Sequence, residues 1–284
     1  MEVSLVEALI CKFTNLRHYY IQESGLPKGD WFVFETSPIP CPLPPFEDLK
    51  MLASDIAGNK LFYQYSDGTL EHLENCDVEY HHLKKEISVA IKDITSQQFK
   101  FAVWTNPDGI LNNQPVVIIL EPEINKIIYP DHPHINSSFT YINYFMPNSI
   151  CYTDDPSLLG NDAYTRIAEA IDQTSIWLFK HQIWLATRSK GNAIWIGPAK
   201  ENEDNEQFSS LRNLSDKCWC NSNKTYYQCH LQQDFYNWKK LNPLINLSFI
   251  NIDGSLNILE YQTFINRRNL LQKKTLRQLK NILL

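Results

Sequence analysis

The sequence lacks any long hydrophobic run. No stretch of about 18 consecutive apolar residues occurs in its 284 residues, so we expect no membrane-spanning helix. The first thirty residues carry acidic and basic side chains every few positions and have no apolar core of the kind a secretory signal peptide needs. These absences favour a cytoplasmic protein.

The chain also lacks an excess of positive charge, and its number of cysteines is odd. Its net charge is −6, whereas a nucleic-acid-binding surface needs clustered lysine and arginine. Seven cysteines, an odd number, argue against a closed set of disulfides, and in the cytoplasm we expect them to be reduced. What is present is apolar material, at 43% hydrophobic residues, enough for one large core or two small ones.

Composition divides the chain into three segments, and the first covers residues 1–90. It opens with a predicted helix from Val3 to Tyr20. After a proline cluster, the stretch KLFYQY and the turn residues Ser66-Asp67-Gly68 predict a β-hairpin. The segment has α+β character, and its sequence indicates no function.

The second segment, residues 91–200, places strands before helices. The runs 99–104 and 116–120 are typical of strands, and a loop containing Cys151 follows them. Asn161 or Asp162 is suited to cap a helix, and a further helical face runs from Ile176 to Thr187. This order predicts an α+β fold.

The third segment, residues 201–284, begins with an acidic loop and ends with a basic helix. A strand-turn-strand unit is predicted around NIDGS at 251–255. The stretch from Phe264 to Leu284 contains six basic residues and no acidic one, with leucines on one helical face. It fits a helix docked on the protein's own surface, and the alternative is an arm that binds a partner or nucleic acid.

Four side chains of the third segment have the chemistry of metal ligands. Cys218, Cys220, Cys229 and His230 lie within a short stretch, as the ligands of a zinc site do. Their spacing, with one residue between the first two cysteines and an adjacent Cys-His pair, departs from common zinc knuckles. We therefore assign no metal and no cofactor from the sequence, and zinc stays an open alternative.

Cys151 lies in a context that resembles a known family. The phrases HPHIN, PNSICYTDDP, WLFKHQIWLAT and AIWIGP follow one another within residues 98–198. In this order they resemble the ubiquitin-conjugating enzymes, and most closely the prokaryotic branch that accompanies cGAS-like nucleotidyltransferases in the anti-phage defence operons called CBASS. The resemblance implies an α+β protein with a ubiquitin-conjugating-like core, an antiparallel sheet with flanking helices, and extensions at both ends.

The resemblance assigns roles to individual residues. Cys151 becomes the nucleophile that carries an acyl group as a thioester, because a thiolate is nucleophilic and a thioester passes its acyl group to an amine. The motif here is His132-Pro133-His134, whereas eukaryotic members have His-Pro-Asn closer to the cysteine. Asn148 is the first candidate for the hydrogen-bond donor to the oxyanion, and His134 is the second. Asp154, with Asp155, is placed to orient an incoming lysine.

Each of these residues also has a plain structural interpretation. His132 and His134 are suited to shape a loop, and the tryptophans Trp177, Trp184 and Trp195 to fill a core. Asp154 is equally suited to a turn before Pro156. If Cys151 is reactive, it should be partly exposed on an extended segment before the helix at about residue 162. Cys11 and Cys76, as packing residues, should then be more buried.

The resemblance also implies partners. The expected cargo is a protein with an activated C-terminus, namely a cGAS-like nucleotidyltransferase, delivered by an activating enzyme and transferred to an amine during anti-phage defence. The alternative is a non-catalytic binding module or adaptor of the same fold, in which Cys151 merely packs.

Overall fold

The structure is a computed structural model that describes most of the chain. Pro133, Asn148, Asp154, Cys76 and the turn at 66–68 lie outside the described residues. The described residues are 4–38, 61–64, 70–73, 97–105, 114–125, 127, 131–132, 134–136, 149–153, 159–188, 193–196, 208–220 and 222–284.

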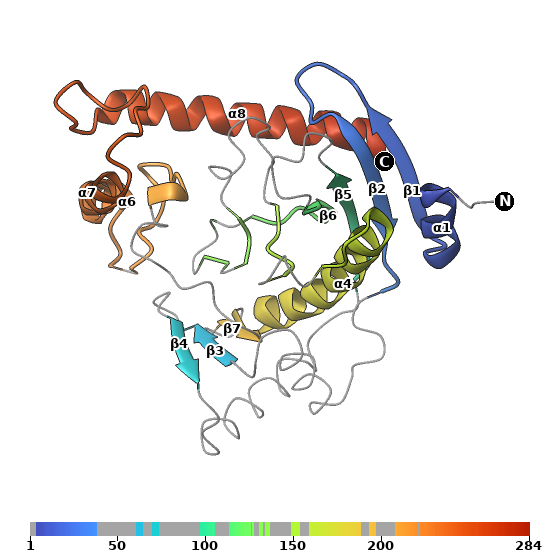
Figure 1. Cartoon of the computed structure of the whole chain (residues 1–284). Helices are drawn as coiled ribbons and strands as arrows, with labels where there is room; N and C mark the ends of the chain where they lie inside the picture. The colour runs from blue at the N-terminus through green and yellow to red at the C-terminus, as the bar shows by residue number, and fades with distance from the viewer. Residues whose placement is uncertain are drawn as a thin grey trace.

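The central sheet has helices on both faces and is antiparallel and four-stranded (Figure 1). The order of the strands in this sheet is β1-β2-β5-β6, and neighbouring strands are hydrogen-bonded to each other. The runs 99–104 and 116–120, which the sequence predicted as strands, are confirmed as β5 and β6. Both are buried almost throughout, since the sheet is covered on both faces. The strands are β1 (Leu16–Ile21), β2 (Gly29–Glu35), β5 (Lys100–Thr105) and β6 (Val116–Glu121).

The helix predicted from Val3 to Tyr20 is wrong in its second half. Helix α1 (Leu5–Lys12) begins at a capping box formed by Ser4 and Glu7, and the chain becomes extended at Phe13. The following LRHYYI is β1, paired antiparallel with β2. Its aromatic side chains suit a half-buried sheet surface, and this pairing outweighs the local helical spacing.

One face of the sheet is covered by α1 and by the long helix α4 (Ala163–Arg188). Asp162 caps α4, because its Oδ1 accepts the Thr165 N–H at 2.9 Å. The two helical faces expected between Tyr164 and Thr187 belong to this single helix. Its apolar positions and the facing side chains of the sheet form one core with Trp177, Leu178 and Trp184.

The other face of the sheet is covered by the end of the terminal helix α8 (Ile258–Leu283), as Figure 1 shows. Leu279 and Leu283 belong to one buried cluster with Trp31 and Trp104, and Lys280 Nζ lies 2.7 Å from a Glu123 carboxylate oxygen. The predicted basic helix and its docking on the protein's own surface are confirmed. Four basic side chains still point to solvent, so the partner-binding alternative stays a prediction: Arg267, Lys273, Lys274 and Arg277.

The opposite end of α8 belongs to a separate core within the C-terminal segment. That core also holds α6 (Tyr226–Cys229) and α7 (Leu231–Leu241) and surrounds Phe208, whose ring contacts several aromatic neighbours. The unit expected around NIDGS is a turn closed by a single bridge between Ile250 and Leu256. Neither α8 nor any other helix in the described part of the chain has both the length and the apolarity needed to cross a bilayer.

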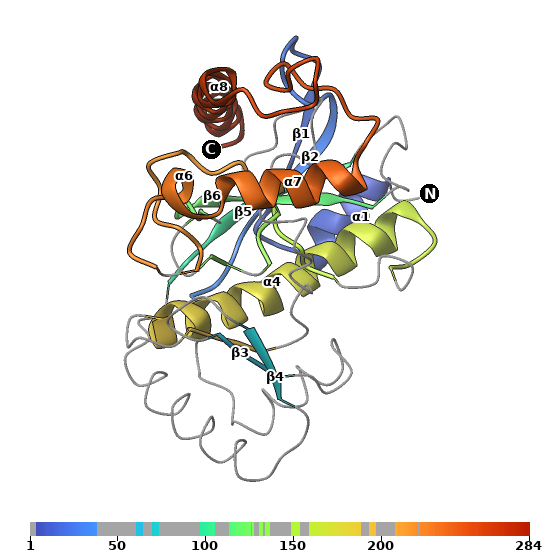
Figure 2. The ribbon, with the colours of Figure 1, turned by 90° about the vertical axis from the view of Figure 1, so that its left-hand side faces the viewer.

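A second, three-stranded sheet lies beyond α4 (Figure 2). The predicted hairpin is confirmed as β3 (Leu61–Gln64) and β4 (Leu70–Leu73), and β3 also pairs with β7 (Ala193–Ile196). Trp195 on β7 is buried in the core beneath α4. Strands from residues 1–90 thus pair with strands from 91–200 in both sheets, and the two predicted segments share one core.

Candidate functional site

Cys151 lies on an extended segment that continues the central sheet beyond β6. The Ile150 N–H donates to Val117 O on β6 at 2.9 Å, and the Cys151 N–H donates to His134 O at 3.0 Å. Ile150 and Ile135 form an antiparallel bridge. The cysteine segment is therefore held between β6 and residues 134–136, and α4 begins soon afterwards at Ala163. The predicted extended setting of Cys151 before this helix is confirmed.

The Cys151 side chain is half-buried, with its Sγ 3.5 Å from the carbonyl oxygen of Thr153. The accompanying expectation for Cys11 is wrong, because that thiol is exposed. Leu9 is the one fully buried residue of α1, and a residue two positions later points to the opposite side of a helix. Cys76 lies outside the described residues.

His132 is completely buried and held by hydrogen bonds on both ring nitrogens. The His134 backbone N–H donates to His132 Nδ1 at 3.1 Å, so Nδ1 must be an acceptor. His132 Nε2 then carries the proton and donates to His181 Nδ1 on α4, also at 3.1 Å. This chain of bonds fixes His132 as a neutral imidazole and ties the segment before Cys151 to α4.

Aromatic rings surround both histidines of the motif. The His132 ring centroid lies 4.6 Å from that of Trp184, and the His134 ring stacks on Trp195 at 4.7 Å. His134 is 3% exposed. These contacts favour the structural interpretation of both side chains: they position the main chain of His134, whose carbonyl holds Cys151, and the tryptophans fill the core as proposed from the sequence.

Burial without a charged partner lowers the pKa of His181 to about 4. Its ring stacks on Trp177 and contacts Phe99 edge-on, and its Nδ1 faces His132. His181 therefore stays neutral in the folded protein across the physiological range, while it titrates near 6.5 when exposed.

We expect the free energy of unfolding to fall by about 2 kcal/mol between pH 7 and pH 5 because of His181. The unfolded chain takes up a proton at this residue as the pH drops through 6.5, and the folded protein does not until about pH 4. Urea unfolding at several pH values measures how the free energy of unfolding changes with pH. His181→Gln keeps an acceptor for His132 but does not titrate, so its stability should depend less on pH. An equal dependence of stability on pH in the wild type and in His181→Gln would contradict the assignment of this effect to His181.

Sequence reasoning missed Asn136 as a member of the site. It lies on the segment beside the cysteine, where its N–H donates to Ser149 O at 2.7 Å and its Nδ2 lies 3.4 Å from Ser149 Oγ. The side chain is half-buried and can donate a second N–H. The motif HPHIN contains a signal for this position. Residues i and i+2 of a strand point to the same face, so Asn136 is expected on the same face as His134. Asn148 and Asp154 lie outside the described residues, so their roles stay predictions.

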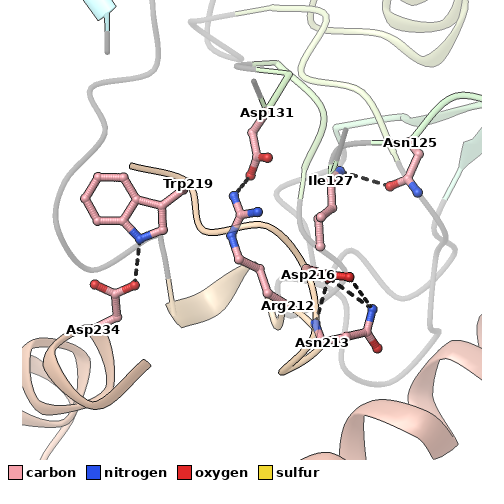
Figure 3. A network of polar contacts seen from close by, with 8 residues as sticks. All are labelled: Asn125, Ile127, Asp131, Arg212, Asn213, Asp216, Trp219 and Asp234. Carbon is pink, nitrogen blue, oxygen red and sulfur yellow. Dashed lines mark hydrogen bonds and ion pairs between the residues drawn. The ribbon is translucent and has the colours of Figure 1, made fainter. Parts of the chain in front are cut away.

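A buried ion pair connects this region to the C-terminal segment. The Arg212 guanidinium is 1% exposed and contacts the carboxylate of Asp131, the residue before His132 (Figure 3). Arg268 of α8 donates from Nη1 to Leu211 O at 3.2 Å, next to that arginine. The C-terminal segment thus contacts, through Arg212, the residue that precedes the histidine motif.

A half-buried thiol on an extended segment held by backbone hydrogen bonds is suited to act as the nucleophile in acyl transfer. The described contacts position the main chain on both sides of Cys151. Comparisons with protein-family models, with curated proteins and with solved structures found no match to this chain.

Proposed function

We propose that this chain is a ubiquitin-conjugating-like acyltransferase that carries a protein C-terminus as a thioester on Cys151. One observation carries the proposal, namely the order of elements around the cysteine. Along the chain, a first helix is followed by the four strands of the antiparallel sheet, with β3 and β4 between the second and the third. The extended segment with Cys151 beside the histidine motif and then a long helix come next. Ubiquitin-conjugating enzymes, which the sequence resembles, use this order.

The proposed chemistry has two steps. The Cys151 thiolate attacks the carbonyl carbon of an activated C-terminus, and the activating group leaves with its electron pair as the thioester forms. An amine then attacks the same carbonyl, the tetrahedral oxyanion collapses, and the Cys151 thiolate leaves while the amine loses a proton to solvent. Neither step needs an oxidant, a metal ion or a cofactor.

The second step needs a hydrogen-bond donor for the oxyanion. Asn136 lies on the segment that pairs with the cysteine segment, where its N–H donates to Ser149 O, and Asn148 is the carboxamide nearest to Cys151 in sequence. The His134 ring is packed on Trp195, so His134 contributes its main-chain carbonyl, which accepts the Cys151 N–H, and not a side-chain donor to the oxyanion. Asp154 retains its proposed role in orienting the attacking lysine.

The proposed cargo is the C-terminus of a cGAS-like nucleotidyltransferase, delivered by an activating enzyme. This part rests on the family resemblance alone. Conjugation of the nucleotidyltransferase would then control synthesis of a second messenger during anti-phage defence.

Co-expression of the chain with the proteins encoded beside its own gene tests the proposal. We expect an adduct in a non-reducing gel that disappears with reductant, forms in Cys11→Ala and is lost in Cys151→Ala. Cys11 is a suitable control because its thiol is more exposed than that of Cys151, so general thiol reactivity would favour it. Absence of any adduct in the wild type, or equal loss in both variants, would overturn the proposal in favour of a non-catalytic binding module.

A further inference from the structure

Four candidate metal ligands converge in the C-terminal segment, far along the chain from Cys151. The ligand atoms of Cys218, Cys220, Cys229 and His230 all lie within 4.8 Å of one another. Cys220 Sγ is 3.6 Å from Cys218 Sγ and 3.5 Å from Cys229 Sγ. His230 Nδ1 is 3.2 Å from Cys218 Sγ and 3.1 Å from Cys229 Sγ. Each side chain therefore points to a common centre.

The local backbone brings the four residues together despite their unusual spacing. The Cys218 N–H donates to Lys224 O at 3.0 Å, which closes a tight turn, and Asn223 within that turn has a φ of 58°. Thr225 then caps the short helix α6 through Gln228. The turn supplies the first two cysteines and the end of α6 supplies Cys229, so each pair of ligands comes from a separate, hydrogen-bonded element.

We propose that Cys218, Cys220, Cys229 and His230 bind one zinc ion. Tetrahedral zinc, with bonds of about 2.3 Å to sulfur and about 2.0 Å to nitrogen, keeps its ligand atoms about 3.5 to 3.8 Å apart. The two sulfur–sulfur separations of 3.6 and 3.5 Å are close to those values, the two sulfur–nitrogen separations of 3.2 and 3.1 Å are somewhat shorter, and the remaining ligand atoms lie within 4.8 Å of one another. Three thiolates and a neutral imidazole are a common zinc ligand set, and binding releases the three thiol protons to solvent as the zinc–sulfur bonds form.

The site is structural rather than catalytic. All four tetrahedral positions are taken by protein atoms, which leaves none for water or substrate. The Trp219 ring packs on His230 at 4.5 Å, and its Nε1–H donates to Asp234 Oδ2 on α7 at 2.9 Å, as Figure 3 shows for the latter contact. Zinc would fix the turn onto α6 and α7, beside the small aromatic core of this segment.

Metal analysis of the full chain purified without chelator tests the site. We expect about one zinc per chain in the wild type, and about a tenth of that or less in Cys220→Ser and in Cys229→Ser. His230→Cys, which offers a fourth thiolate, should retain zinc. Cys11→Ser and Cys151→Ser are matched controls that change thiols outside the cluster, and they should retain zinc as well.

Cobalt gives a second readout on the wild-type chain that no variant's folding defect can affect. Exchange with Co²⁺ should produce the visible bands of a tetrahedral thiolate complex, and chelation of the native metal should lower the thermal midpoint. A wild-type chain without stoichiometric zinc and without the cobalt bands would overturn the proposal. So would a Cys220–Cys229 disulfide in place of metal, or iron in place of zinc. None of these readouts depends on acyl transfer.

Discussion

Replacement of Cys151 by serine is expected to convert a reductant-sensitive adduct into one that survives reductant, or to abolish the adduct, with little change in stability. A serine hydroxyl is far less nucleophilic than a thiolate without a dedicated base, so transfer to an amine should fall by two orders of magnitude or more, on the order of 100-fold. An oxygen ester, if it forms, is less reactive than a thioester and accumulates. Mass spectrometry of the adduct and the thermal midpoint are measured on the same protein.

The thermal midpoint distinguishes the alternatives for Cys151. The thiol is half-buried with its Sγ 3.5 Å from Thr153 O, so a hydroxyl finds an acceptor and solvent nearby. A fall of the thermal midpoint that corresponds to about 1 to 3 kcal/mol would instead show that the Cys151 side chain packs in an apolar setting. Partner binding would then fall only with the folded fraction. Full defence activity in Cys151→Ser would refute the catalytic role.

The sequence predicted the α+β character and the strands best, and it did so where patterns are local. The runs that became β5 and β6 are almost continuously apolar, which is typical of strands covered on both faces. The first helix was predicted too long because its spacing continues past Lys12. What ends it is pairing of β1 with β2, a contact between strands that a pattern along one chain does not contain.

The candidate sites show the same limit. The extended setting of Cys151 was predictable from neighbouring residues, whereas the partner that holds the His132 ring was not. That ring is fixed by His181, which lies on α4 and is joined to it only in the folded chain. The four residues of the cysteine cluster were noticed, but their spacing argued against a metal. A turn with a positive φ at Asn223 brings them together, and nothing in the spacing indicates that turn.

Asp131→Ala is expected to lower the free energy of unfolding by about 3 to 5 kcal/mol. The change leaves the guanidinium of Arg212, which is 1% exposed, without its carboxylate partner. Little solvent reaches that charge, so the desolvation of the guanidinium is no longer balanced by a carboxylate in direct contact with it. Urea unfolding gives the value. Asp172→Ala is the matched control, because Asp172 pairs with Lys12 on the surface with side chains 55% and 41% exposed. That change should cost at most about 1 kcal/mol.

A double-mutant cycle separates the pair from its surroundings. Asp131→Leu combined with Arg212→Met removes both charges and keeps apolar volume, so the double variant should be more stable than Asp131→Leu alone. That result would identify the unpaired guanidinium of Arg212 as the cause of the lower stability of Asp131→Leu. Asp131 also precedes the buried His132, and loss of the tie should loosen the segment whose His134 carbonyl accepts the Cys151 N–H. Adduct formation on Cys151 should then recover in the double variant together with stability. Equal costs for Asp131→Ala and Asp172→Ala would contradict this account, because they would mean that the buried pair contributes no more than a solvent-exposed one.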